Sequence, residues 1–548
     1  MTGAGLRPRD ALWRLRTRES GLCDGIAVLL CVLVLARAAW LTADLSWPAG
    51  TDQLRDIAFA ESFARGEWMS DPFFVGEWLW YPPLVPWLVG AASAVAGVPA
   101  SMADVRLGPY INVLSPLAFY ALVSMWIGRR AALASLVAFL FLDRGPYWLE
   151  PTYSPWLLAG PATQAVFYAG LMALTRAHRT PTRLNWAMAG VALGLAAMGH
   201  SAPALVLGVL AAATAGTEAF TTFRPVRAAG HLLIAGSVAA AVCSPLLASI
   251  AGHYGLHIRN PAGLLWTDPA VEGSAWSLLT SNTWALPLTV VAAVGMVSRS
   301  AKHEGEARPG RWLLIGWLAV SLALFATHRH EVATVRAGNP TGLPVFSPPH
   351  HFLFYFRAGL LVAFGAGCAA LVSHAARLAG RWPPVRGRTR AGSQVAFAAL
   401  LGLLMFISVP TWLPRADYTQ LAREARRVFA PPEWQGLIRW MRSRTSTSDA
   451  FIAADSPALS IVGATGRKVV ALDRFFANPY VDVQPRLVAR QLYWDALASG
   501  DCASARRLAQ RYQASYVIHA RSPEVSPGAC GLETVFEIRG VRVDRIRN

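Results

Sequence analysis

The chain has 548 residues, of which 54% are hydrophobic and only 15% are charged, and its mean hydropathy is +0.36. Soluble domains carry about 25% charged residues, so this composition excludes an ordinary soluble protein and predicts an integral membrane protein. The net charge of +18 does not indicate a nucleic-acid partner. Most of the excess lies in short loops between apolar runs, where membrane topology accounts for it.

The apolar runs predict a polytopic α-helical membrane protein with about eleven spans. A spanning helix needs about 20 residues, and runs near that length lie at about 24–43, 109–128, 131–149, 156–175, 184–200, 202–219, 228–250, 283–298, 312–327, 354–375 and 393–412. A further run, 83–99, is short and follows the prolines of "YPPLVP", which suit an entry loop or an interfacial helix better than a span interior.

Charge decides the orientation of these spans, because Lys and Arg favour cytoplasmic loops. If 83–99 does not cross, all the basic segments face inside. These segments are the N-terminus, the loop at Arg129, and the loops "RAHRTPTR", "RSAKHEGEARPGR" and "RLAGRWPPVRGRTR". We therefore predict a cytoplasmic segment 1–23, a membrane domain 24–412 and a chain that continues on the outer side after residue 412.

On this topology four segments meet on the outer face, where a site could assemble. They are a long first loop 44–108, the short loop "DRGPYWLEPTYSP", and the segments 251–274 and 328–357. The first loop contains "PAGTDQLRDIAFAE", in which Asp52 and Asp56 are four residues apart. In a helix this spacing puts both carboxylates on one face.

The composition changes after Leu413, and residues 413–548 predict a small extracytoplasmic α/β domain. Helical patterns occur at "YTQLAREARRVF", "PEWQGLIRWMRSR", "PRLVARQLYWDALA" and "ASARRLAQRYQ". Strand patterns occur at "AFIAAD", "KVVAL", "SYVIHA", "LETVFEIRG" and "VRVDRIR", and the last two meet at Gly540 as a candidate hairpin.

Cysteines and short motifs add little chemistry. Cys502 and Cys530 both lie in the soluble domain, where an oxidising compartment would allow them to pair, although two thiols alone do not decide this. The sequence has no CxxC or HExxH metal signature, no P-loop and no GxGxxG. ATP hydrolysis and dinucleotide chemistry therefore have no local support.

Three stretches of the outer face, "TDQLRDIAFAESFARGEW", "WYPPLVPWL" and "DRGPYWLEPTYSPWLLAGPATQ", resemble the GT-C superfamily of membrane glycosyltransferases. The layout of many spans followed by an outer soluble domain is similar too. The resemblance implies a polyprenyl-phosphate-linked sugar as donor and a glycan, lipid or protein acceptor on the outer face of the cell membrane. It also implies inversion at the anomeric carbon. Common members carry an acidic pair after the first span, where this chain has Asp52 and Gln53.

With this resemblance, Asp52 is the predicted general base, since a carboxylate near a membrane is partly desolvated and accepts a proton more readily. The alternative is that Asp52 only caps a helix. Asp56 is predicted to organise the surroundings of Asp52 on a helix packed on both sides. The substitution of Gln53 for an acid leaves open whether a divalent cation takes part as a cofactor.

Other outer residues are predicted to bind the substrates. Cationic side chains and hydrogen-bond donors would stabilise the leaving lipid phosphate, and Tyr81 would stack on a sugar. Each of these residues also has a purely structural interpretation, as a loop, helix-turn or membrane-interface residue. The predicted substrate-binding set is Asp56, Tyr81, Arg144, Glu150, His200, His350, His351 and Arg357; Asp143, Arg259, Asp268 and Arg336 are weaker candidates on the same side.

Two other functions stay open at this point. A transporter or flippase of lipid-linked precursors would carry ionisable residues inside its spans and internal repeats. Here the spans have few charges at their centres, and no repeat is visible. A catalytically inactive scaffold for envelope glycan assembly is the other alternative, and the missing second acid after Asp52 favours it.

Overall fold

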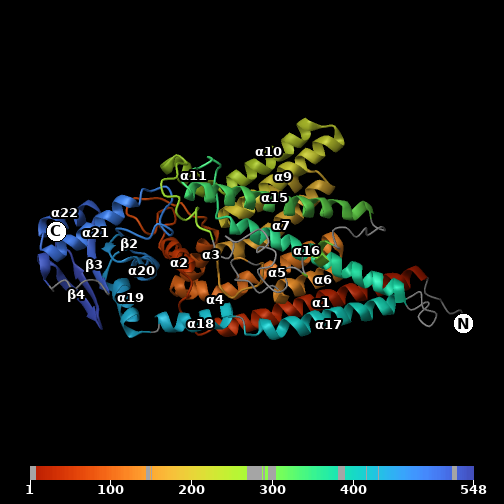
Figure 1. The fold of residues 1–548 in the computed structure, drawn as a ribbon, viewed down its shortest axis with the longest axis horizontal. Coiled ribbons are helices and arrows are strands. Elements are labelled where there is room, and N and C mark those ends of the chain that lie inside the picture. Colours follow the sequence, from red (N-terminus) through yellow and green to blue (C-terminus); the bar gives the residue numbers. More distant parts are fainter. Residues whose placement is uncertain are drawn as a thin grey trace.

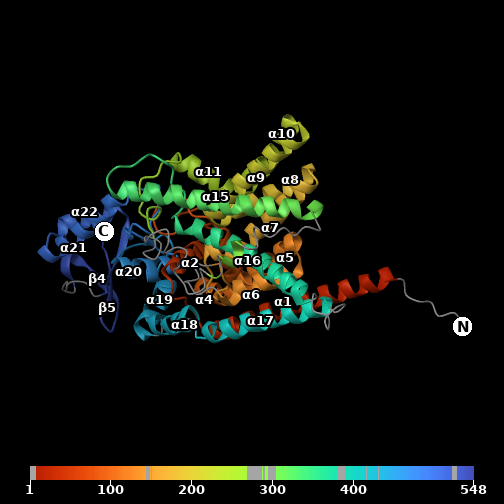
Figure 2. The same cartoon turned by 45° about the vertical axis from the view of Figure 1, so that its right-hand side comes forward.

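The computed structural model describes residues 8–142, 149, 151–267, 287, 290–293, 304–379, 389–414, 416–429, 431–520 and 528–547. Long helices form a bundle at one end of the molecule, and a mixed sheet with its own helices lies at the other end (Figure 1). The N-terminus is at the bundle end and the C-terminus lies in the sheet domain, and a second view shows the same separation (Figure 2).

Seven helices in the described part of the chain are long and apolar enough to cross a membrane, which confirms a helical membrane protein. They are parts of α1 (Pro8–Thr42), α4 with α5 (Ala100–Asn112 and Leu114–Ile127), α9 (Ser201–Thr222), α10 (Pro225–Val242), α15 (Glu304–Arg336), α16 (His350–Ala379) and α17 (Thr389–Trp412). The predicted total of eleven spans stays a prediction, since most of the run 283–298 lies outside the described residues.

Helices that are shorter or less apolar complete the bundle. They are α6 (Arg129–Val137), which continues as a π-helical turn at Ala138–Leu142, and α7 (Ala159–Arg179), α8 (Arg183–Gly199) and α11 (Ser244–Tyr254). Close packing needs small residues between them: a Cβ at Gly190 would lie 2.5 Å from the carbonyl oxygen of Ala235. Small residues at helix–helix contacts are typical of membrane bundles, because apolar lipid provides no hydrophobic drive for helices to associate.

The first outer loop is folded into three helices, α2 (Thr51–Ala64), α3 (Leu84–Ala96) and α4. Helix α3 is apolar but short, and the position of 83–99 relative to the membrane stays a prediction. Helix α4 begins at Ala100, inside the predicted loop 44–108. The apolar pattern starts late because α4 carries Asp104 and Arg106 in its first two turns.

The C-terminal domain is built on a five-stranded sheet in the order β2-β1-β3-β5-β4. The strands are β1 (Ala450–Ile452), β2 (Lys468–Val469), β3 (Ala514–Ala520), β4 (Glu533–Ile538) and β5 (Val541–Arg545). Strand β1 pairs in parallel with β2 and β3, whereas β5 pairs antiparallel with β3 and β4. The predicted hairpin is present, and Gly540 supplies the positive φ of 80° at its turn.

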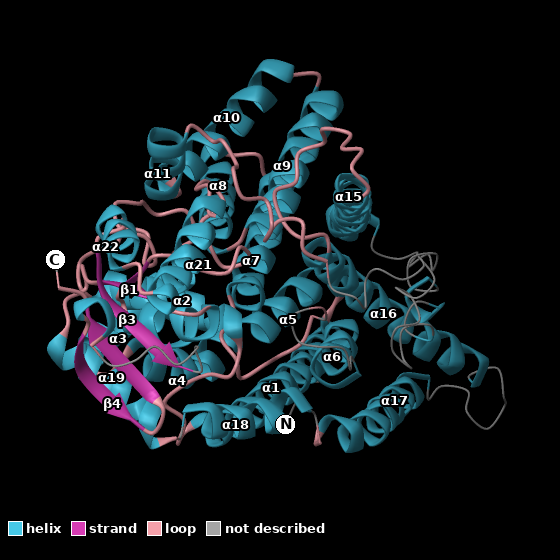
Figure 3. Ribbon diagram, turned by 60° about the vertical axis from the view of Figure 1, so that its left-hand side comes forward, coloured by secondary structure: helices cyan, strands magenta, loops and turns pink. Residues whose placement is uncertain are grey.

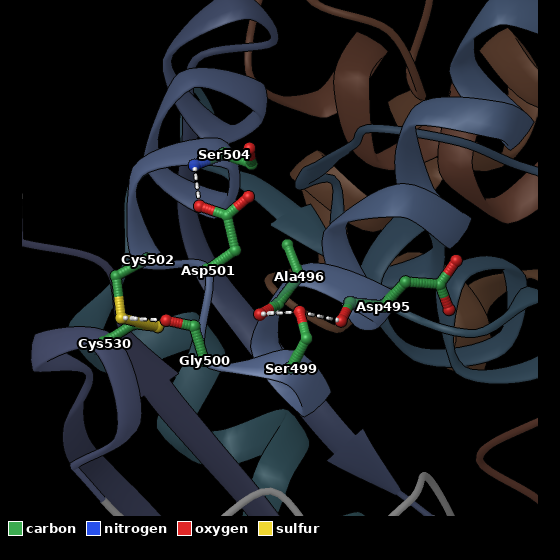
Figure 4. The surroundings of a disulfide bond; sticks show 8 residues. All are labelled: Asp495, Ala496, Ser499, Gly500, Asp501, Cys502, Ser504 and Cys530. Carbon is green, nitrogen blue, oxygen red and sulfur yellow. Dashed lines mark hydrogen bonds between the residues drawn. A yellow bond between two sulfur atoms is a disulfide. The ribbon is translucent and has the colours of Figure 1, made fainter.

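Helices α19 (Pro432–Arg444), α21 (Gln484–Ser499) and α22 (Cys502–Arg511) accompany the sheet, which lies at one side of the helical body (Figure 3). Helix α18 (Ala416–Phe429) precedes them and lies beside α1, where Arg426 pairs with Asp44 at 2.8 Å. Cys502 and Cys530 form a disulfide between α22 and the segment before β4 (Figure 4). Beside it, the Asp501 carboxylate caps α22 by accepting a hydrogen bond from the Ser504 amide at 3.0 Å.

The domain is attached directly to the first outer loop. Phe73 lies beside the edge strand β2, and its carbonyl oxygen accepts a hydrogen bond from the Val469 amide at 2.7 Å. Glu61 of α2 accepts from Arg442 of α19 at 2.8 Å and from Arg65 at 3.2 Å. Helix α2 is therefore held between the sheet domain and the bundle (Figure 1), and the residues buried along it confirm that it packs on both sides.

Candidate active site

The start of α2 presents two carboxylates with an arginine between them. Asp52 lies in the first turn and its side chain is 56% exposed. The Arg55 guanidinium lies 3.3 Å from Oδ1 of Asp52 and 3.5 Å from Oδ1 of Asp56. Residue Gly50 occupies the N-cap, with no side chain bonded there, so the alternative in which Asp52 caps the helix is not what the structure shows.

Tyr81 closes the site from the far side of Arg55. One guanidinium nitrogen of Arg55 donates to the Tyr81 hydroxyl at 2.8 Å, and the guanidinium carbon lies 4.1 Å from the centre of the ring. Tyr81 itself stacks on Phe59 of α2, with 5.5 Å between ring centres. The arginine is therefore fixed by two charges, a hydroxyl and an aromatic face.

Burial separates the two aspartates. Asp56 is 2% exposed, and its Oδ2 has no hydrogen-bond partner among the described residues. Burial raises the pKa of Asp56 to about 6, although the neighbouring Arg55 lowers it. The partial desolvation expected of Asp52 is wrong for that residue, since its carboxylate is largely in solvent, and the desolvated carboxylate is Asp56, one helical turn further on.

Gln53 takes the place of the second acid that common GT-C members carry. It is buried, and its amide donates to Oδ2 of Asp104 on α4 at 3.1 Å. Asp104 is fully buried, and its Oδ1 has no hydrogen-bond partner in the described part of the chain. The charge of Asp56 also acts on the Asp104 carboxylate. A second carboxylate is thus present beside α2, but it comes from another helix.

Three histidines meet beside Arg55. The ring centres of His200 and His351 are 4.4 Å apart, and those of His350 and His351 are 4.1 Å apart. His200, between α8 and α9, accepts the Ala202 amide at 3.1 Å through Nδ1, which fixes its ring. The positive charge of Arg55 acts on both His200 and His351. The structure thus places His200 and His351 within the electrostatic range of Arg55, which itself contacts Asp52, Asp56 and Tyr81.

Two small structural features shape the histidine cluster. Gly160 at the start of α7 lies against it, since a Cβ there would lie 3.7 Å from Cδ2 of His200 and 3.9 Å from Nδ1 of His351. Trp266 packs edge-on against His350, with ring centres 4.9 Å apart. His350 is buried, and its Nδ1 has no hydrogen-bond partner among the residues described.

The remaining predicted residues lie elsewhere. Arg144 and Glu150 fall outside the described residues, as do Asp143 and Asp268. Arg357, nearly two turns into α16, donates to the carbonyl oxygen of Leu149 at 3.4 Å. Arg336 donates to the carbonyl oxygen of Leu265, and Arg259 lines a separate cavity.

The described residues around Asp52 do not form a metal site. No group of three His, Cys, Asp or Glu side chains in the described part of the chain could hold an ion. The position between Asp52 and Asp56, where a cation would balance both carboxylates, is filled by the guanidinium of Arg55. We therefore derive no step through a metal.

Sequence reasoning missed Arg55 and Asp104 as parts of this site. Arg55 stands in the quoted motif three residues after Asp52, a spacing at which opposite charges pair on a helix, so a signal was present. Asp104 follows an apolar stretch as a single carboxylate, and nothing in its local pattern indicates that it contacts Gln53 from 51 residues away.

No family model matches the chain, and no curated protein is significantly similar to it. Solved structures are similar in fold. The apo structure of ArnT from Cupriavidus metallidurans aligns with a TM-score of 0.51 at 13% identity, over 94% of this chain and 97% of that protein. The arabinofuranosyltransferase AftD from Mycobacteria aligns with a TM-score of 0.52 at 16% identity, over 94% of this chain but only 40% of that larger protein.

The chain has a GT-C fold. The match with ArnT covers nearly the full length of both chains, so the GT-C fold here includes the C-terminal sheet domain as well as the bundle. At these identities the similarity shows the fold, and the chemistry has to be argued from the residues of the site.

Proposed function

We propose that the protein is a membrane glycosyltransferase that moves a sugar from a polyprenyl-phosphate donor to an acceptor hydroxyl on the outer face of the membrane. The observation that carries this proposal is the start of α2. There a solvent-accessible carboxylate, Asp52, is held by Arg55 beside an aromatic ring and three histidines. The GT-C fold, which this chain shares with an arabinofuranosyltransferase, supports the same reaction class.

Asp52 is the proposed general base because it is the carboxylate of the site that an acceptor can reach. It takes the proton of the acceptor hydroxyl while that oxygen bonds to the anomeric carbon from the face opposite the phosphate. The bond between the anomeric carbon and the phosphate oxygen breaks, its electron pair leaves with the polyprenyl phosphate, and the anomeric configuration inverts. A positioned base of this kind contributes about 10²–10⁴-fold to the rate.

Arg55 and the histidines are proposed to serve the donor. The departing phosphate gains negative charge, and fixed donors stabilise such charge best when they need no rearrangement. Arg55 is fixed by its contacts with Asp52, Asp56 and Tyr81. His351 and His200, in ring contact with each other and within range of the charge of Arg55, add imidazole donors. Asp56 holds the guanidinium in place.

The placement of this site on the outer side is part of the proposal. The disulfide between Cys502 and Cys530 suits an oxidising compartment, and the domain that contains it is bonded to the loop that carries Asp52. The other four cysteines of the chain are free thiols, and all four are buried. The sugar and the acceptor are left open by these residues.

The test is an Asp52→Asn variant of the purified full chain, assayed for transfer from a panel of polyprenyl-phosphate sugars. We expect a loss of about 10²–10⁴-fold with unchanged thermal unfolding, because Asp52 is exposed. Asp495→Asn, an exposed aspartate on α21, is the matched control and should keep full activity. Full activity of Asp52→Asn would exclude Asp52 as the base. A wild-type chain that never turns over, but co-purifies with an active transferase, would favour the scaffold alternative.

A further inference from the structure

A cavity lined by arginines lies between the segment after α11 and the C-terminal domain. Its volume is about 290 Å³, at the lower end of the ~300–1,000 Å³ typical of small-molecule pockets. The segment 259–265 forms one wall and the segment 474–484 forms the other. The lining residues are Arg259, Asn260, Pro261, Ala262, Leu265, Arg474, Asp482, Val483 and Gln484.

The two walls are fixed to one another. The amides of Arg259 and Asn260 both donate to the carbonyl oxygen of Pro479, at 2.9 and 2.8 Å. The Asn260 side chain donates to the carbonyl oxygen of Arg474 at 2.8 Å. The backbones also approach closely at Gly263, where a Cβ would lie 3.0 Å from the carbonyl oxygen of Phe475. The cavity is therefore a built feature of the junction.

The charge of this cavity is positive, with two guanidinium groups and one carboxylate among its lining side chains. The side chain of Gln484 orients Arg474 by accepting a hydrogen bond from it. The backbone N–H of Gln484 donates to Oδ1 of Asp482 at 3.1 Å. Within the described ranges, the Arg259 side chain has no hydrogen-bond or ion-pair partner. A planar guanidinium offers paired N–H donors that match a carboxylate or a phosphate, so the cavity is suited to an anionic group.

The same segment connects the cavity to the candidate active site. It runs from Arg259 in the cavity to Trp266, whose ring packs against His350 with 4.9 Å between ring centres. Its Leu265 lines the cavity and also receives a hydrogen bond from Arg336 at 3.1 Å. The segment that lines the cavity therefore also contacts the histidine cluster, through Trp266.

We propose that this cavity is an acceptor subsite that binds the carboxylate or phosphate of an anionic saccharide. Arg259 and Arg474 pair with the anion, while Asn260, Asp482 and Gln484 supply the hydrogen-bonding groups that a sugar ring needs. The inference rests on the proposed transferase function, because it treats the bound saccharide as the acceptor whose hydroxyl Asp52 deprotonates.

The experiment measures binding by the detergent-solubilised full chain, without any transfer reaction. Glucuronate and glucose 6-phosphate are titrated by calorimetry against neutral glucose. We expect both anionic sugars to bind at least ten-fold more tightly than glucose, and added salt to weaken them, because ion pairs of exposed groups are screened. Arg259→Gln and Arg474→Gln should each reduce that affinity at least ten-fold.

Two controls separate this inference from the proposed function. Arg506→Gln removes the same charge from an exposed position on α22 and should leave binding unchanged. Asp52→Asn should also bind both anionic sugars normally, whether or not it transfers sugar. Equal affinity for glucose and the anionic sugars, or equal loss in all three arginine variants, would overturn the subsite and leave the role of Asp52 standing.

Discussion

At the scale of single residues, the site depends on how Arg55 is shared. It balances an exposed carboxylate and a buried one, and its charge reaches two histidines. An arginine fixed in this way cannot be replaced by lysine without loss, because only the planar guanidinium can pair with both carboxylates and lie against the Tyr81 ring. Asp52 is exposed, and the Arg55 guanidinium balances the charge of its carboxylate.

The buried carboxylate of Asp56 gives the first prediction at this scale, a pH-dependent stability. Burial raises the pKa of Asp56 to about 6, so the folded protein binds this proton more tightly than the unfolded chain does. The resulting stabilisation is present at low pH and is lost as the pH rises through about 6. Between pH 5 and pH 8 the wild type should therefore lose about 1 kcal/mol more than Asp56→Asn, measured by thermal unfolding in detergent.

The wild type and Asp56→Asn are compared by how their unfolding free energies change with pH, and not by their values at one pH. The reason is that the Asn side chain also changes the contact with Arg55 at every pH. Asp495→Asn, on the exposed side of α21, is the reference that should follow the wild type throughout. Parallel curves for the wild type and Asp56→Asn would contradict a raised pKa at this position.

At the scale of elements, sequence patterns predicted what depends on local periodicity. Alternating apolar residues predicted the five strands of the sheet, and apolar residues at 3.6-residue spacing predicted four helices of this part of the chain. The structure has all of them at the predicted places; the helices are α18, α19, α21 and α22. The start of α4 was missed because its charged first turns hide an apolar helix. The partner of Gln53 was missed for a different reason: Asp104 is brought to α2 by packing between helices, which leaves no trace in either local pattern.

The docking of α2 on the sheet domain gives the next prediction. Glu61 is 6% exposed and binds Arg442, Arg65 and the Ala100 amide. Glu61→Gln removes the charge that balances two arginines, so we expect a loss of about 1–3 kcal/mol in unfolding free energy. We also expect faster proteolysis between the bundle and the domain. Both are measured on the purified chain.

An exposed ion pair in the same domain is the control for Glu61. Glu533 lies 3.4 Å from Arg547, with both side chains well exposed, and such surface pairs contribute about 0–1 kcal/mol. Glu533→Gln should therefore leave both the unfolding and the proteolysis pattern close to wild type. Equal effects of the two substitutions would show that Glu61 is not the contact that attaches the domain.

At the scale of the whole molecule, the contacts between the first loop and the C-terminal domain place Asp52 and the sheet domain on the same side of the membrane. The Phe73–Val469 pairing and the Glu61–Arg442 ion pair cannot form across a bilayer. Charge in the connecting loops then predicts which side that is, since the basic loops favour the cytoplasm.

The last prediction therefore concerns topology. All six native cysteines are either buried or bonded to each other, so single added cysteines can be labelled over a low background. Ser448→Cys, exposed in the sheet domain, should react with a membrane-impermeant maleimide on intact cells, whereas Thr222→Cys, exposed at the end of α9, should react only after permeabilisation. The second variant is the control for leakage. Labelling of Thr222→Cys alone on intact cells would put the site in the cytosol and remove the basis for an outer-face transferase, because the domain and Asp52 would then both face the wrong compartment.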